Sequence, residues 1–247
     1  MQATTIELLL VAGLLLLLGL AFAIGRRIGR RHPDEHPQLG VVQGATLGLM
    51  GLILGFSFSG AMTRFAARED LIVKQANALS TAYLRTDLIT QQGPALRDAL
   101  KQYASLLPGA FDNPSTTSFT ARQDQLTDLE ATIWSHATTA ARQEPAFAVP
   151  LLTPLNELFD TRTARIAATQ RHLPTLILIA LVACATISVG TIGYGMAGGS
   201  KSLLPPAIAL VLLMVAILWI VIDLDHPRHG LIRISDAPLE SVIRSLR

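Results

Sequence analysis

The chain has 247 residues, half of them hydrophobic and only 15% charged, with a net charge of +2 and a mean hydropathy of +0.43. A soluble domain carries nearer a quarter charged residues, so this composition excludes an ordinary soluble protein, and the small net charge gives no support for nucleic-acid binding. The apolar residues form four blocks, each close to the roughly 20 residues that a helix needs to cross a bilayer. The blocks cover residues 6–24, 41–63, 173–195 and 203–222. The sequence therefore predicts an all-α integral membrane protein with four transmembrane helices.

The first block, residues 6–24, needs to be distinguished from a signal peptide, because A-F-A at 21–23 resembles a peptidase site. A signal peptide opens with a basic region. This chain instead begins MQATTIE, and its basic cluster RRIGRR (26–31) follows the apolar run. That order favours a retained membrane helix over a cleaved signal.

The second block, residues 41–63, carries a stripe of small residues along one helix face. Its members follow one another at spacings of 4, 3, 4 and 4: Gly44, Gly48, Gly51, Gly55 and Ser59. Glycine weakens a helix in water by about 1 kcal/mol, so a stripe of glycines in a membrane helix indicates close approach of another helix. The spacing leaves two partners open, namely other helices of the same chain or copies of this helix around an oligomer axis.

Residues 64–172 have the composition of a soluble domain, with eleven basic and eleven acidic residues between Arg64 and Arg171. Their apolar periodicity and helix breakers predict four helices, which cover 64–91, 94–107, 119–143 and 151–172. Nothing between residues 60 and 92 breaks a helix, so the second membrane helix and the first soluble helix are expected to form one rod. Ser118 or a nearby threonine is the expected N-cap of the helix that begins near 119.

The third block ends in T-I-G-Y-G (191–195), which matches a potassium-channel selectivity filter letter for letter. Such a filter needs a pore helix before it and a full membrane helix before that. The preceding segment, 156–174, is charged and does not suit lipid. We therefore predict one spanning helix over 173–195, with Gly193 and Gly195 loosening its end. The single cysteine, Cys184, lies inside this helix and cannot form an intrachain disulfide.

Two polar clusters contain residue types that bind metals. The first follows the fourth block, in a predicted C-terminal tail that covers residues 223–247, and consists of Asp223, Asp225, His226 and His229. The second lies in the loop after the first block and consists of His32, Asp34, Glu35 and His36. We interpret both as polar turns rather than metal sites. The sequence contains no nucleophile elbow, phosphate loop or zinc spacing, so it predicts neither an enzyme nor a cofactor.

Three segments resemble the signature motifs of a bacterial family of bestrophin-like membrane proteins: GLILGFSFSGAMTRF (51–65), QANALSTAYLR (75–85) and DLDHPRHG (223–230). Through L-G-F at 54–56 and D-A-P-L-E at 236–240, the chain is also remotely similar to the bestrophin ion channels. That resemblance implies a homopentamer whose second helices surround a pore, with an apolar neck as its gate.

Carried over from L-G-F, the neck positions in this chain are Phe56, Leu52 and Gly48. Gly48 departs from the expected pattern, since a bulky residue is expected there. Arg64 falls at the membrane boundary, where its side chain is expected to reach the interface.

The leading interpretation is a homo-oligomeric channel for monovalent ions in the bacterial inner membrane. The alternative is a non-conducting membrane scaffold or signalling protein whose soluble helices bind a partner. Eight basic residues lie near the membrane ends on the side of the soluble domain, and five lie near those on the other side. Since basic residues favour the cytoplasmic side, this count favours a cytoplasmic soluble domain with both termini on that side. The dense cluster RRIGRR argues for the opposite orientation.

Overall fold

The structure is a computed structural model that describes residues 2–31, 38–111, 116–197, 204–225 and 232–246. Within these ranges the regular elements are all helical, which confirms the all-α prediction. Contacts divide the chain into two units. The membrane unit comprises Met1–Thr63 and His172–Ile232, and the helical unit comprises Arg64–Arg171 and Arg233–Arg247.

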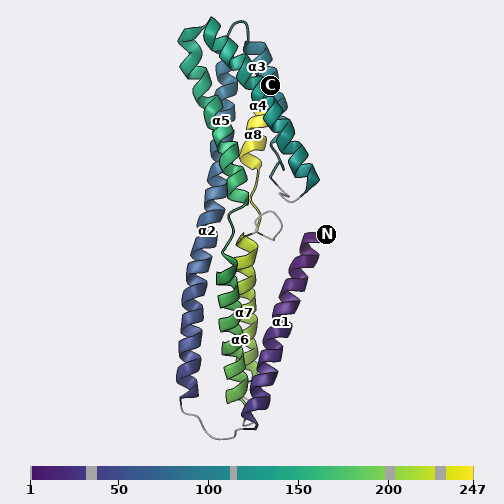
Figure 1. Ribbon diagram of the computed structural model, residues 1–247, viewed down its shortest axis with the longest axis vertical. Coiled ribbons are helices and arrows are strands. Elements are labelled where there is room, and N and C mark those ends of the chain that lie inside the picture. The colour runs from purple at the N-terminus through teal and green to yellow at the C-terminus, as the bar shows by residue number, and fades with distance from the viewer. Residues whose placement is uncertain (1, 32–37, 112–115, 198–203, 226–231, 247) are drawn as a thin grey trace. The chain divides into compact units, whose positions relative to one another are not determined.

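The membrane unit contains the helices that are long and apolar enough to cross a bilayer, and each covers nearly all of one predicted apolar block. They are α1 (Gln2–Gly29), the N-terminal part of α2 (Leu39–Arg85), α6 (Thr175–Gly195) and α7 (Leu204–Asp225) (Figure 1). Their shared core contains Leu18 of α1, Leu181 and Val189 of α6, and Val221 of α7, all fully buried.

Glycine on both helices allows the C-terminal half of α1 to approach α6 closely (Figure 1). A Cβ added to Gly25 would collide with the carbonyl oxygen of Gly190, and a Cβ added to Gly193 would collide with that of Phe22. The helix α6 continues without interruption through Gly195. In T-I-G-Y-G, Gly193 therefore serves close helix packing within the chain, a different role from the loosened helix end that the sequence suggested.

The helical unit contains the C-terminal part of α2 followed by α3 (Gly93–Leu106), α4 (Thr117–Gln143), α5 (Ala148–Thr169) and α8 (Ala237–Ser245). Two short 3₁₀ turns, Thr86–Leu88 and Pro145–Phe147, connect these helices. The side-chain oxygen of Thr116 accepts a hydrogen bond from the Phe119 N–H at 3.3 Å, so Thr116 is the N-cap of α4.

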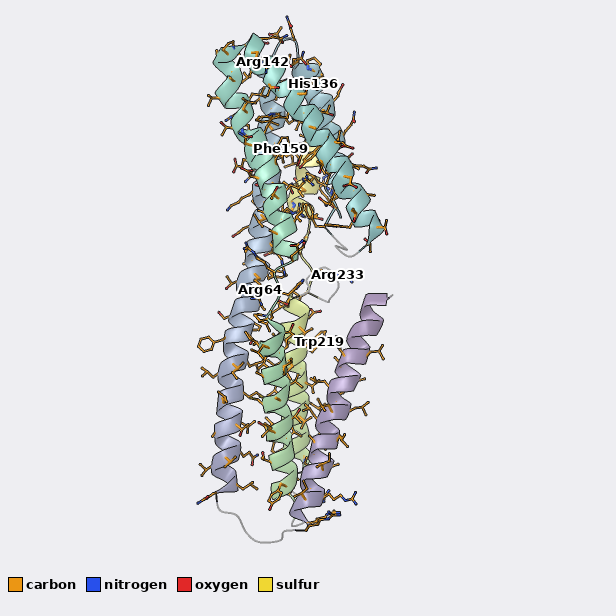
Figure 2. All side chains as sticks on the ribbon, viewed as in Figure 1. Arg64, His136, Arg142, Phe159, Trp219 and Arg233 are labelled. Atoms are coloured by element: carbon orange, nitrogen blue, oxygen red, sulfur yellow. The ribbon has the colours of Figure 1, made fainter. Side chains whose placement is uncertain are left out.

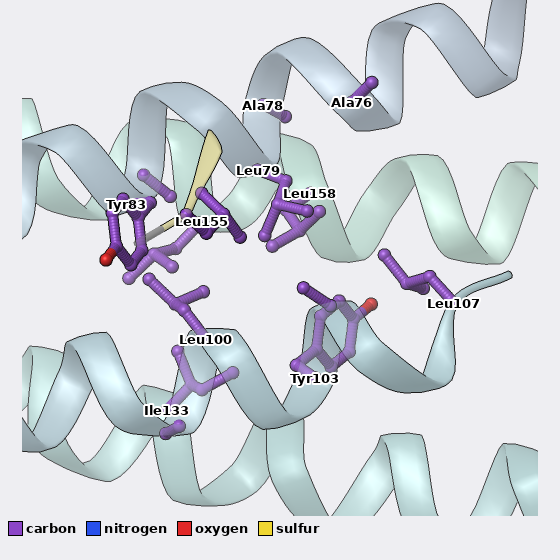
Figure 3. Close-up of a cluster of buried hydrophobic side chains, with 14 of the residues drawn as sticks. Ala76, Ala78, Leu79, Tyr83, Leu100, Tyr103, Leu107, Ile133, Leu155 and Leu158 are labelled. Carbon is purple, nitrogen blue, oxygen red and sulfur yellow. The ribbon is translucent and has the colours of Figure 1, made fainter. Parts of the chain in front are cut away.

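The core of the helical unit contains buried apolar side chains from every helix in it, and Figure 3 shows part of this core. Leu79 of α2, Leu100 and Tyr103 of α3, Ile133 of α4 and Leu155 of α5 are all fully buried. Leu239 of α8 is also fully buried in this core. The end of the predicted tail thus belongs to the helical unit, because its apolar face completes that core.

Helix α2 runs without a break from Leu39 to Arg85. Its 47 residues correspond to a length of about 70 Å at 1.5 Å per residue, more than twice the hydrocarbon thickness of a bilayer. The predicted single rod is therefore confirmed, but it ends at Arg85 rather than near residue 91, where the chain tightens into the 3₁₀ turn.

Candidate functional site on helix α2

The small-residue stripe of α2 faces away from the rest of its own chain. Each of its five residues is exposed. A Cβ added to any of its four glycines, Gly44, Gly48, Gly51 and Gly55, would meet no atom of the described residues within 4 Å. Within the described ranges, the close helix approach that such a stripe permits is therefore unused, in contrast to the glycines between α1 and α6.

The three neck positions lie on the same exposed side of α2. Phe56 is 72% exposed and Leu52 is 58% exposed, and Gly48 is also exposed. The residues of α2 that pack into the membrane unit's core include Met50 and Leu54. Leu52 and Phe56 follow these by two residues, or about 200° around a helix, so they point nearly opposite to the core.

The hydroxyl groups of two threonines on this part of α2, Thr46 and Thr63, bond to the helix itself. Thr46 donates to the carbonyl oxygen of Val42 at 2.7 Å, and Thr63 donates to that of Ser59 at 2.9 Å. Such bonds to the preceding turn satisfy the hydroxyl donors locally. The exposed side of α2 therefore presents large apolar side chains separated by glycines.

Arg64, the first α2 residue of the helical unit, is half-buried (Figure 2). One turn further along α2, Arg68 is buried and donates to the carbonyl oxygens of Ala168 at 3.1 Å and Arg171 at 2.7 Å. These carbonyls lie at the C-terminal end of α5, where a cation is favoured by the helix dipole. The sequence did not single out Arg68 for this role, because its partner is a backbone segment about a hundred residues away.

A buried ion pair between α4 and α5 was also not foreseen. The Arg162 guanidinium donates to both carboxylate oxygens of Glu130, at 2.7 and 2.9 Å, and the Tyr103 hydroxyl donates to the same carboxylate at 2.9 Å. Burial, and then the negative charge of Glu130, raise the pKa of Tyr103 far above its ordinary value. Since every group in this cluster has a protein partner, we assign it to the stability of the helical unit.

The D-A-P-L-E motif also has a structural role. The Asp236 carboxylate accepts from Arg165 at 3.1 Å and from the Gly109 N–H at 3.2 Å, while Gly109 adopts a left-handed backbone with φ of 67°. Arg165 also donates to the Gln75 side-chain oxygen at 2.5 Å, and its guanidinium lies 3.9 Å from the centre of the Phe111 ring. This motif fixes α8 at the core of the helical unit.

The weak metal candidates of the tail are occupied by backbone hydrogen bonds. Asp223 accepts from the Ile232 N–H at 2.9 Å, and Asp225 accepts from the Leu173 N–H at 2.8 Å. A metal-ligating group of three His, Cys, Asp or Glu residues is not found among the residues that the structure describes. The remaining candidates lie outside the described residues: His226, His229, His32, Asp34, Glu35 and His36.

Within the described part of the chain, the fold thus defines an all-α membrane protein with four apolar helices, one of which extends into a second, helical unit. A profile of the bestrophin-like domain matches residues 11–239. Because this match covers most of the chain, the protein belongs to the bestrophin-like family.

A solved structure agrees with this assignment at the level of the fold. It is the crystal structure of a bacterial bestrophin homologue from Klebsiella pneumoniae that carries a tryptophan-to-alanine substitution. The two structures share a TM-score of 0.65 and 15% sequence identity over 95% of this chain and 96% of the other. A comparison with curated proteins found no match.

Proposed function

We propose that the protein is a homo-oligomeric ion channel in which copies of α2 surround a central pore. The observation that carries this proposal is the unfilled glycine stripe beside an exposed phenylalanine on a membrane-spanning helix. A second copy of α2 is a fitting partner for such a face, since small residues let helix backbones approach closely in membranes. Membership of the bestrophin-like family supports the same conclusion.

In this proposal the constriction consists of Phe56 and Leu52. Rings of apolar side chains one helical turn apart can close a narrow pore by excluding water. Gly48 adds no side chain at the third position, so the neck is one turn shorter than the bestrophin resemblance implies. The permeating species are monovalent ions, and we propose five copies as the resemblance implies.

We further propose that the protein resides in the bacterial inner membrane with the helical unit and both termini in the cytoplasm. The excess of basic residues near the membrane ends on that side supports this orientation. Its partners in this scheme are the bilayer, the permeating ions and other copies of the same chain.

The proposal is tested by ion flux into liposomes that contain the purified protein. Replacing the neck phenylalanine, Phe56→Ala, is expected to raise the flux of a monovalent cation or anion over wild type, because it widens and hydrates the constriction. The matched control is Phe58→Ala, since Phe58 lies two residues further along and about 200° around α2. If wild type and both variants conduct nothing, the protein is instead a scaffold or signalling component.

A further inference from the structure

Four arginines gather where helix α1 ends. Arg26 and Arg27 lie in its last turn, and Arg30 and Arg31 follow directly. We call these four residues the basic end of α1. Three of them are exposed, and Arg26 is half-buried.

The guanidinium groups of the basic end have no acceptor among the residues that the structure describes. The hydrogen bonds formed there are between backbone atoms, such as Arg30 N–H to the Arg26 carbonyl oxygen at 3.2 Å. The Nε atom of Arg26 is buried and has no hydrogen-bond partner within the described ranges. An unpaired donor in such a position loses its hydration without compensation, so the site favours an anionic acceptor.

The basic end is also held in a fixed position. Gly25 contacts the backbone of Gly190, and Gly29 contacts the backbone of Tyr194, so the last turn of α1 is packed tightly on α6. The arginines between and beyond these glycines therefore project from a rigid helix end rather than from a free segment.

An apolar row leads along α1 to the arginines. Its members are spaced three to four residues apart, so they share one face of the helix. All are exposed large apolar residues: Leu17, Leu20, Ile24 and Ile28. Arg27 and Arg31 continue the same face, three residues beyond Ile24 and Ile28 respectively. One face of α1 thus combines a hydrocarbon-compatible row with two cations at its end.

We propose that the basic end of α1 binds the phosphate of an anionic phospholipid whose acyl chain lies along the apolar row. Guanidinium groups bind phosphate through paired hydrogen bonds, which suits several arginines at one helix end. A free phosphate ion has the same charged group as the lipid but no acyl chain, so it would contact the arginines and leave the apolar row uncovered. The proposal does not depend on ion conduction.

The test is native mass spectrometry of the full-length protein in detergent with added phosphatidylglycerol or phosphatidylcholine. Wild type is expected to retain phosphatidylglycerol preferentially. Replacing all four arginines with glutamine is expected to remove that preference, and each single replacement to weaken binding about fivefold. The matched control is Arg142→Gln, because Arg142 also lies in the last turn of a helix, α4, but outside the membrane unit (Figure 2).

Three results would overturn the proposal. The first is equal retention of the two lipids by wild type, a comparison that requires no variant to fold. The second is undiminished phosphatidylglycerol binding by the fourfold variant or, if that variant does not fold, by the Arg27→Gln/Arg31→Gln double variant. The third is displacement of the lipid by inorganic phosphate at equal concentration, which would indicate a free-phosphate site.

Discussion

The guanidinium of Arg165 and the carboxylate of Asp236 form a buried ion pair at 3.1 Å, with their side chains only 4% and 9% exposed. Arg165 belongs to α5 and Asp236 directly precedes α8. The pair therefore ties the last helix of the chain into a core formed mainly by residues more than 70 positions earlier.

Replacing Asp236 with alanine leaves the Arg165 cation buried without its carboxylate. Losing one partner of a buried pair typically costs about 3–5 kcal/mol, so we expect Asp236→Ala to lower the unfolding free energy of the helical unit by about 3 kcal/mol. Denaturant unfolding followed by circular dichroism measures this. The control is Glu240→Ala, because Glu240 pairs with Arg244 at 3.9 Å on an exposed face and such pairs contribute little. Equal losses for both variants would contradict the assigned role of Asp236.

The interface between α1 and α6 requires glycine at its close contacts. We expect Gly193→Ala to reduce the stability of the protein by about 1–3 kcal/mol, since the added methyl group meets the Phe22 backbone, which has little room to move. Thermal unfolding in detergent detects the change. Gly13→Ala is the control, because its added methyl group has no neighbour within 4 Å among the residues that the structure describes, and it should be neutral or slightly stabilising.

The buried Tyr103 hydroxyl predicts a specific dependence of stability on pH. Burial and the charge of Glu130 raise the pKa of Tyr103 in the folded protein above its unfolded value near 10. The folded state therefore holds the Tyr103 proton more tightly than the unfolded state does. Its contribution to the unfolding free energy is fully present below a pH of about 10 and is lost as the pH rises above that value.

The comparison that isolates this effect is wild type against Tyr103→Phe. The stability difference between them is expected to be constant from neutral pH to about pH 9 and to shift against wild type at higher pH. Unfolding free energies measured across this range for both proteins provide the test. A difference that is independent of pH throughout would show that the tyrosine hydroxyl ionises equally easily in the folded and unfolded chains.

Gly48 offers a second test of the proposed neck, independent of Phe56. The substitution Gly48→Leu restores a large side chain at the third neck position, where an added Cβ meets no atom of the described part of the chain within 4 Å. We expect it to reduce liposome ion flux at least severalfold while leaving the protein stable, since a longer apolar constriction is harder to hydrate. Flux equal to wild type would place Gly48 away from the ion path.

Most of the helical architecture could be predicted from the sequence. Apolar blocks of bilayer length located the membrane helices, and breakers such as Gly93-Pro94 separated the soluble ones. The end of α2 was predicted several residues beyond its actual position, because the 3₁₀ turn at Thr86–Leu88 contains no glycine or proline to mark it. The role of α8 was also missed. Leu239, Val242, Ile243 and Leu246 recur at helical spacing, but the spacing of so short a segment does not show which core its apolar face joins.

The candidate site was only half predictable. Spacing identified the glycine stripe of α2, but it could not say whether Gly51 and Gly55 meet the same chain or another one. The glycines that do pack within the chain include Gly25, just beyond the first apolar block, and Gly193, within the third. Neither belongs to a stripe like that of α2, so their pairing depends on how α1 and α6 meet in three dimensions. For the same reason, the partners of Arg68 and Arg165 could not be identified from local sequence.

The most direct test of the central claim is an electron cryomicroscopy map of the detergent-solubilised protein, with the position of Phe56 as the readout. The proposed channel predicts a rotationally symmetric assembly with the α2 helices innermost and the Phe56 rings converging on the axis. A monomeric particle, or an assembly in which Phe56 faces the surrounding detergent, would contradict it.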